Sequence, residues 1–208
     1  MHEMSKAVVR RMSQPGFVGT YFVGEGIDIG AGVDNLAQYG EQFPFMTALK
    51  IWDVEDGDAQ YMAGVENESF DFVHSSHCLE HLHDPFIGIA NWFRILRPGG
   101  HLVILVPDED LYEQGIFPST YNFDHKCTFT IFKPKSWSPR SVNVFDLVNH
   151  LGASAEVINI QLLNSTFRYQ LPRFDQTLTP IGDSAIEFIL RKRPLDEIEK
   201  GGRLPSQT

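Results

Sequence analysis

Short runs of apolar residues alternate along the chain with longer segments in which apolar residues recur every three or four positions. The short runs have the length and composition of buried strands, and they occur at residues 26–29, 48–52, 70–74 and 102–106. Two later runs, near residues 155–163 and 185–190, are predicted to complete the sheet. Strands that alternate with helices in this way are typical of an α/β domain with a mostly parallel sheet.

The clearest helix is predicted between the third and fourth strands. Asp84 is a candidate N-cap, and Pro85 suits the first helical position, where its missing N–H costs nothing. The apolar residues that follow fall on one helix face, at Phe86, Ile89, Ala90, Phe93 and Leu96. The segment Pro98-Gly99-Gly100 is then expected to end the helix and to turn the chain into the next strand.

The periodic pattern weakens after Pro107. Residues 107–140 are rich in proline, aromatic and polar residues, which indicates a long functional loop or insertion. A helix is predicted from about Ser141 to Leu151. We expect a single domain over residues 1–193, followed by a charged and flexible tail over residues 194–208.

Composition indicates a folded, water-soluble chain. Its 208 residues are 42% hydrophobic and 12% aromatic, which suits one domain with a full core. The formal net charge of −10 argues against nucleic acid or an anionic membrane as the main partner. No secretory signal and no apolar run of membrane-spanning length is evident. The two cysteines, Cys78 and Cys127, are too few for a disulfide framework, so we expect a cytoplasmic location.

The first predicted strand carries one acid, Asp28, and runs into the glycine turn Gly30-Ala31-Gly32. Glycines at the carboxyl edge of a parallel sheet let backbone N–H groups approach a nucleotide-like ligand closely. A nicotinamide-binding fingerprint needs a third glycine where this chain has Asn35, which argues against a dehydrogenase. Asp53 ends the second strand about 20 residues later, where an acid is able to accept hydrogen bonds from ribose hydroxyls.

Four segments occur in a characteristic order: GIDIGAG, GDAQYM, ESFDFVHSSHCLEHLHDP and RILRPGGHLVILVP. They cover about residues 24–107, and in combination they resemble the class I S-adenosylmethionine-dependent methyltransferases of the Methyltransf_11 type. The resemblance implies a Rossmann-like α/β fold with a seven-stranded, mostly parallel sheet, an antiparallel last strand and helices on both faces. It also implies S-adenosylmethionine as the cofactor, and substrate recognition by residues 107–140, with the N-terminal segment as a further candidate region.

The same resemblance assigns the residues around the methionine part of the cofactor. Asp28 and the turn Gly30-Ala31-Gly32 would hold the methionine group. Ser75 and Ser76 would lie at the end of their strand, beside the sulfonium.

The adenosine part of the cofactor is assigned to the acidic segment that follows the second strand. The resemblance implies that Asp53 binds the ribose and that Asp58 and Ala59 border the adenine. The interval between the glycine turn and Gly57 is short, which indicates that the helix usually found there is nearly absent. Asp56 therefore remains an alternative to Asp53 as the ribose acid.

Methyl transfer to a hydroxyl group usually also needs a base. His125 is the first candidate, because histidine titrates near neutrality and the adjacent Asp124 is able to hold its tautomer. The alternative for His125 is a loop histidine packed on aromatic side chains. His77 is the second candidate, since it lies close to the predicted sulfonium.

The histidine-rich loop after the third strand offers candidate metal ligands. His77 and His81 are four residues apart and are able to share a helix face, as metal ligands do, with Glu80 between them. The spacing is not that of an HExxH motif and no third ligand is evident, so no metal is predicted. Cys78 is predicted to be a packed side chain rather than a reactive thiol.

These residues together predict an S-adenosylmethionine-dependent methyltransferase that acts on an oxygen of a small or sugar-like acceptor. An anionic acceptor, such as a phosphorylated or nucleotide-linked sugar, stays open because of four basic residues, Lys126, Lys133, Lys135 and Arg140. A solvated basic loop explains these residues equally well. The segment LYEQGIFPSTYNFDHK resembles methyltransferases of bacterial polysaccharide biosynthesis. The alternative function is a non-catalytic, cofactor-binding regulatory or scaffolding protein.

Overall fold

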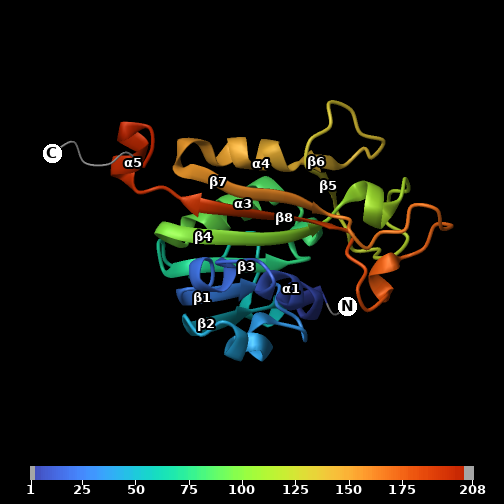
Figure 1. Ribbon diagram of the computed structural model, residues 1–208. Helices are drawn as coiled ribbons and strands as arrows, with labels where there is room; N and C mark the ends of the chain where they lie inside the picture. Colours follow the sequence, from blue (N-terminus) through green and yellow to red (C-terminus); the bar gives the residue numbers. More distant parts are fainter. Residues whose placement is uncertain (1–2, 204–208) are drawn as a thin grey trace.

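A central sheet organises the computed structural model, which describes residues 3–203 (Figure 1). The strand order is β2-β1-β3-β4-β8-β7, and every neighbouring pair is parallel except those that involve β8. The bounds are β1 (Gly24–Ile29), β2 (Met46–Trp52), β3 (Phe70–Ser76), β4 (Leu96–Pro107), β7 (Ala155–Leu163) and β8 (Ala185–Lys192). The mostly parallel sheet with an antiparallel last strand is thus confirmed.

The predicted count of seven strands is wrong, because the sheet has six. The missing strand belongs to the interval between β2 and β3. Among residues 53–69 the structure contains only the short helix η2 (Val54–Asp56) and turns. A further parallel strand in this interval would need two crossovers, one to reach the strand and one to return to β3, each of about a dozen residues or more, and residues 53–69 are too few to supply both.

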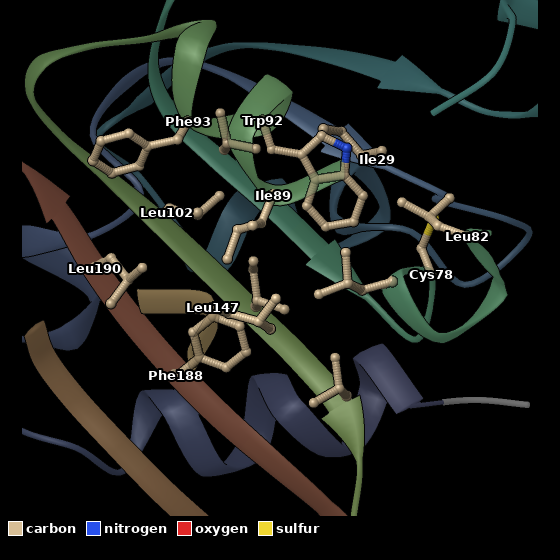
Figure 2. Close-up of a cluster of buried hydrophobic side chains, with 14 of the residues drawn as sticks. Ile29, Cys78, Leu82, Ile89, Trp92, Phe93, Leu102, Leu147, Phe188 and Leu190 are labelled. Carbon is tan, nitrogen blue, oxygen red and sulfur yellow. The ribbon is translucent and has the colours of Figure 1, made fainter. Parts of the chain in front are cut away.

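Helices cover both faces of the sheet, as predicted. One face carries α1 (Glu3–Met12), α2 (Phe17–Thr20) and η1 (Leu36–Gln42), whose apolar side chains form one core cluster with Phe72 and Val103. The other face carries α3 (Pro85–Arg94) and α4 (Val144–Leu151), packed on a larger cluster (Figure 2). In β4, Leu102, Ile104 and Val106 belong to the larger cluster and Val103 to the first, since side chains along a strand point alternately to opposite faces.

Helix α3 begins where the sequence predicts. The Asp84 side chain accepts hydrogen bonds from the backbone N–H groups of Phe86 and Ile87, and Pro85 occupies the first helical turn. The predicted end is wrong, because α3 stops at Arg94 and Leu96 already pairs with Phe70 as the start of β4. The Pro-Gly-Gly segment lies within β4, at a shift in the register between β3 and β4, and is therefore a strand irregularity.

Residues 107–140 form an ordered layer at the carboxyl end of β4 (green to yellow in Figure 1). The layer contains the π-helical turn η4 (Glu109–Glu113) and β5 (Thr128–Thr130), which pairs with β6 (Ser141–Asn143) in a second, two-stranded sheet. Because residues 141–143 belong to β6, α4 begins at Val144 and not at Ser141.

The remaining elements are short. They are η3 (Leu79–His81), η5 (Gly152–Ser154), η6 (Gln176–Leu178) and α5 (Leu195–Lys200). Helix α5 occupies the start of the predicted tail, and its Glu197 pairs with Arg191 of β8 at 2.7 Å. Residues 204–208 of that tail lie outside the described residues. None of the helices within residues 3–203 has the length and apolar character needed to cross a bilayer.

Candidate functional site

The glycine turn after β1 is tied to the end of β2. The backbone N–H of Gly30 donates to the carbonyl oxygen of Trp52 at 2.9 Å, and the N–H of Gly32 donates to Oδ2 of Asp53 at 3.0 Å. Both glycines have positive φ, +68° and +54° respectively. A Cβ on Gly30 would lie 2.5 Å from Cβ of Cys78, whereas a Cβ on Gly32 would meet no atom within 4 Å. The turn is thus packed on one side and open on the other.

Two adjoining cavities open at this carboxyl edge of the sheet. The first cavity has a volume of about 250 Å³ and is bordered by Asp28, the turn Gly30-Ala31-Gly32, Ser76 and the start of α1. The second has a volume of about 650 Å³ and is bordered by Asp53, Asp58, Ala59, His81 and Asp124, among others. Gly30 and His77 border both cavities, so the two spaces meet at these residues.

Asp28 borders the first cavity, but its carboxylate is already engaged. Oδ1 lies 2.6 Å from Nδ1 of His74, and Oδ2 accepts the backbone N–H of Leu36 at 2.8 Å. Nε2 of His74 in turn lies 3.1 Å from the guanidinium of Arg11 in α1. Asp28 therefore fixes the loop that follows the glycine turn and links it to β3.

Arg11 is fully buried, and its guanidinium donates to Oε2 of Glu187 in β8 at 2.8 Å. Burial lowers the pKa of Arg11, and the nearby Glu187 opposes that shift. Glu187 has its pKa lowered, because attraction to Arg11 and Arg10 outweighs the effect of burial. This ion pair anchors α1 beside the first cavity, where Glu3 and Met4 form part of the wall.

Of the two candidate ribose acids, only Asp53 borders the second cavity. Its side chain accepts from the backbone N–H groups of Gly32 and Val54, which orients the carboxylate at the rim. Asp56 instead accepts the backbone N–H of Asp53 at 3.0 Å and completes a capping box around η2. The geometry therefore favours Asp53. Asp58 and Ala59 also border the second cavity, as expected of residues beside the adenine.

The two serines at the end of β3 differ in their positions. Ser76 borders the first cavity, and its Oγ is buried without a hydrogen-bond partner among the described residues. Ser75 is 1% exposed and donates to the carbonyl oxygen of Ile29 at 2.9 Å, so it borders neither cavity. The geometry supports contact with a bound molecule for Ser76, and a structural role for Ser75.

His77, the second candidate base, lies at the junction of the cavities. Its backbone is left-handed, with φ of +54°, and its side chain is 12% exposed. Nδ1 lies 3.4 Å from Oε1 of Glu80, and Nε2 is buried without a hydrogen-bond partner in the described chain. Burial lowers the pKa of His77, but Glu80 and Glu3 outweigh it, and the net shift is upward.

His125, the first candidate base, is 3% exposed and borders neither cavity. Its Nδ1 lies 2.6 Å from Oε1 of Glu113, and its ring packs on those of Tyr112 and His81. Asp124, expected beside it, instead contacts Nδ1 of His81 at 2.9 Å. The structure thus places His125 behind His81, as seen from the second cavity, and its role as the base stays a prediction.

Cys78 is a packed side chain. It lies beside Leu82 in the larger core cluster (Figure 2) and is 8% exposed. Burial and the nearby Glu80 raise its pKa to about 12, so the thiol stays protonated near neutral pH.

Two of the four basic residues of the 107–140 layer are paired with acids. Lys133 contacts Glu109 at 2.8 Å and Asp110 at 2.6 Å, and Lys126 contacts Asp124. The cavities themselves are bordered by acidic residues and by none of the four basic ones. The positive charge predicted beside the site is therefore neutralised in part and lies outside both cavities.

Several residues that border the cavities were not predicted individually from the sequence. Glu3 and Met4 belong to α1, which lies in the N-terminal segment that the resemblance indicated only in general as a further region of substrate recognition. Trp52 borders the second cavity from the end of β2. Their approach depends on how the elements pack, which no local pattern encodes.

The residues present fit S-adenosylmethionine. The turn leaves open space above Gly32, the Asp53 carboxylate stands at the rim of the second cavity, and Ser76 and His77 offer unpartnered buried polar atoms between them. A carboxylate suits a ribose diol, and open backbone suits a close ligand. The fold and this edge together define a class I, Rossmann-like methyltransferase domain.

Comparisons with known proteins agree with that class. The Methyltransf_23 family model, described as a methyltransferase domain, matches residues 6–143, and the chain belongs to this family. The matching model differs from the Methyltransf_11 type expected above, but the class is the same. S-adenosylmethionine is accordingly the cofactor. No curated protein matches the sequence.

Solved structures show the same fold at low sequence identity. An S-adenosylmethionine-dependent methyltransferase from Archaeoglobus fulgidus is 17% identical with a TM-score of 0.58, covering 92% of this chain and 95% of that chain. One from Mesorhizobium loti is 14% identical with a TM-score of 0.53, covering 91% of this chain and 98% of that chain. At such identities the similarity establishes the fold alone.

Proposed function

We propose that the protein transfers the methyl group of S-adenosylmethionine to an oxygen of a small acceptor. The observation that carries this proposal is the junction of two cavities at Gly30 and His77, with Asp53 on one side and Asp28 and the glycine turn on the other. The cofactor supplies a methyl group bonded to a positively charged sulfur. The sulfur is a good leaving group, because it departs as a neutral thioether when the methyl group is transferred. The first cavity would take its methionine part and the second its adenosine part.

The chain's own contribution is alignment and proton removal. Methyl transfer needs the acceptor oxygen in line with the carbon–sulfur bond, in a space that excludes bulk water. His77 is the side chain best placed to accept the hydroxyl proton, because it borders both cavities and its Nε2, 4.0 Å from Oε2 of Glu3, has no hydrogen-bond partner among the described residues. Ser76 offers a second polar group beside it.

The acceptor that suits this site is a neutral, hydroxyl-bearing small molecule, such as a sugar. The ion pairs of Lys126 and Lys133 give an anionic acceptor no support, and Asp124 and Asp58 would repel one. A role in polysaccharide biosynthesis, a cytoplasmic location, and recognition of the acceptor by residues 107–140 within a single domain ending at 193 stay predictions.

His77→Asn tests the assignment of the base. Release of S-adenosylhomocysteine is measured over a panel of hydroxyl-bearing acceptors, neutral and phosphorylated. With an active acceptor, we expect the variant to lose about 100-fold or more in turnover. Its affinity for S-adenosylhomocysteine, measured by calorimetry, should stay within about twofold, since proton removal contributes to turnover and not to cofactor binding.

His83→Asn is the matched control, because His83 lies in the same loop but is exposed and borders neither cavity. Full turnover by His77→Asn would contradict the assignment. Cofactor binding without turnover of any acceptor would favour the alternative, a non-catalytic cofactor-binding protein.

A further inference from the structure

A buried carboxylate, Glu80, lies at the centre of three histidines. Its side chain is 0% exposed, and neither of its oxygens has a hydrogen-bond partner within the described part of the chain. Oε1 lies 3.4 Å from Nδ1 of His77, 4.0 Å from Nε2 of His81 and 3.9 Å from Nε2 of His125. A buried, unpartnered carboxylate is costly, so the surroundings are expected to supply a counter-charge.

Two of these histidines are held in the orientation that metal ligands adopt. Nδ1 of His81 lies 2.9 Å from Oδ2 of Asp124, and Nδ1 of His125 lies 2.6 Å from Oε1 of Glu113. A carboxylate on Nδ1 fixes the proton there and leaves the lone pair on Nε2. Both Nε2 atoms face Glu80, so one carboxylate oxygen and two imidazole nitrogens converge on the same small space.

We propose that Glu80, His81 and His125 bind a divalent transition-metal ion. One ligand atom from each of the three residues lies within 4.8 Å of the other two, a spacing that small side-chain movements bring to the separations found around a single ion. Two imidazoles and one carboxylate suit zinc, iron, cobalt or manganese better than magnesium or calcium, which prefer oxygen ligands. This proposal differs from the sequence-based prediction, in which no metal is bound.

The sequence could not reveal the third ligand, because it lies in a separate segment. His125 comes from the 107–140 layer, whereas Glu80 and His81 come from η3. The two segments meet where the backbone N–H of Lys126 donates to the carbonyl oxygen of Glu80 at 2.7 Å. That contact places the residue next to His125 directly against η3.

The ion would stand at the wall of the second cavity. His81 and its partner Asp124 both border that cavity, and the His81 side chain is 27% exposed. Three protein ligands leave coordination positions open, as in catalytic rather than structural metal sites. If the proposed methyl transfer holds, an acceptor hydroxyl bound there would lose its proton more readily to solvent or to a base.

Cobalt(II) titration of the chelator-treated, full-length protein tests the site. The visible absorption of bound cobalt reports ligand geometry, and calorimetry gives the affinity. We expect saturation at one ion per chain and displacement by zinc. Glu80→Gln keeps the size of the side chain but removes its charge, and should weaken cobalt binding by about 100-fold. Glu113→Gln, which disturbs only the partner of His125, should weaken it by about 10-fold or more.

His83→Asn is the control here as well, since His83 is exposed and lies outside the cluster, and it should bind cobalt like the wild type. Circular dichroism and thermal unfolding establish that Glu80→Gln is folded. Equal cobalt affinity in wild type and Glu80→Gln, or no saturable binding by the wild type, would overturn the proposal. Binding of S-adenosylhomocysteine by the same samples reports the cofactor site separately, so failure of one site is distinguishable from failure of the other.

Discussion

Gly30 and Gly32 have the same left-handed backbone but opposite surroundings, and this difference gives a prediction. Gly30→Ala would force Cβ to 2.5 Å from Cys78 in the core, in addition to the conformational penalty of about 1–2 kcal/mol. Gly32→Ala carries only the conformational penalty, because its Cβ would meet no atom within 4 Å. Urea unfolding should therefore rank Gly30→Ala well below Gly32→Ala in stability.

The affinity for S-adenosylhomocysteine should show a different pattern. Gly32 borders the first cavity, so its new methyl group would occupy space meant for the ligand. We expect Gly32→Ala to remain folded and to bind S-adenosylhomocysteine at least about 10-fold more weakly in calorimetry. Equal stability of the two variants would contradict the packing of Gly30 against Cys78, whereas unchanged affinity in Gly32→Ala would show that the turn does not hold the cofactor.

At this scale the sequence predicts residues whose roles depend on local backbone. The glycine turn, Asp53 and Asp58, which the sequence predicts at the site, all border one or both of the two cavities in the structure. It does not predict side chains whose surroundings are long-range. Asp28 is engaged by His74 and Leu36, and His125 is directed toward Glu80, because segments far apart in the sequence meet there.

At the scale of elements, α1 is held beside the site by ion pairs that centre on the buried Glu187, which pairs with both Arg11 and Arg10. Arg11→Ala would leave Glu187 with Arg10 alone, at 3.4 Å, so we expect a loss of about 3 kcal/mol, at the lower end of the cost of breaking a buried ion pair. The double variant Arg11→Met with Glu187→Gln removes the uncompensated charge and should recover a good part of that loss. Chemical unfolding measures the free energy of unfolding of the single and the double variant. A loss below about 1 kcal/mol in Arg11→Ala would show that α1 is held by its apolar contacts instead.

The boundaries of the helices and strands show where local sequence signals compete with strand pairing. Asp84 and Pro85 start α3 as predicted, because capping is a local interaction. Leu96 and Ser141 were assigned to helices, yet both lie in strands, because pairing with β3 and with β5 satisfies their backbone groups instead. The seventh strand implied by the resemblance is missing because the interval between β2 and β3, residues 53–69, is too short for two crossovers.

At the scale of the whole molecule, the parallel sheet brings the ends of β1, β2 and β3 to one edge, where both cavities of the proposed cofactor site open. The alternation of strands and helices was enough to predict this arrangement. The cavities are completed by α1 and by the 107–140 layer, which are far apart in the sequence. Their packing, and with it the cluster around Glu80, is a property of the assembled molecule.

The central claim is that S-adenosylmethionine binds across the glycine turn with its ribose at Asp53. Calorimetric titration with S-adenosylhomocysteine of the wild type, Asp53→Asn and the control Asp56→Asn tests it most directly. We predict saturable binding of one molecule per chain, weakened about 10-fold or more in Asp53→Asn by the loss of charged hydrogen bonds, and nearly unchanged in Asp56→Asn. Absence of binding by the wild type, or a larger loss in Asp56→Asn than in Asp53→Asn, would contradict the account.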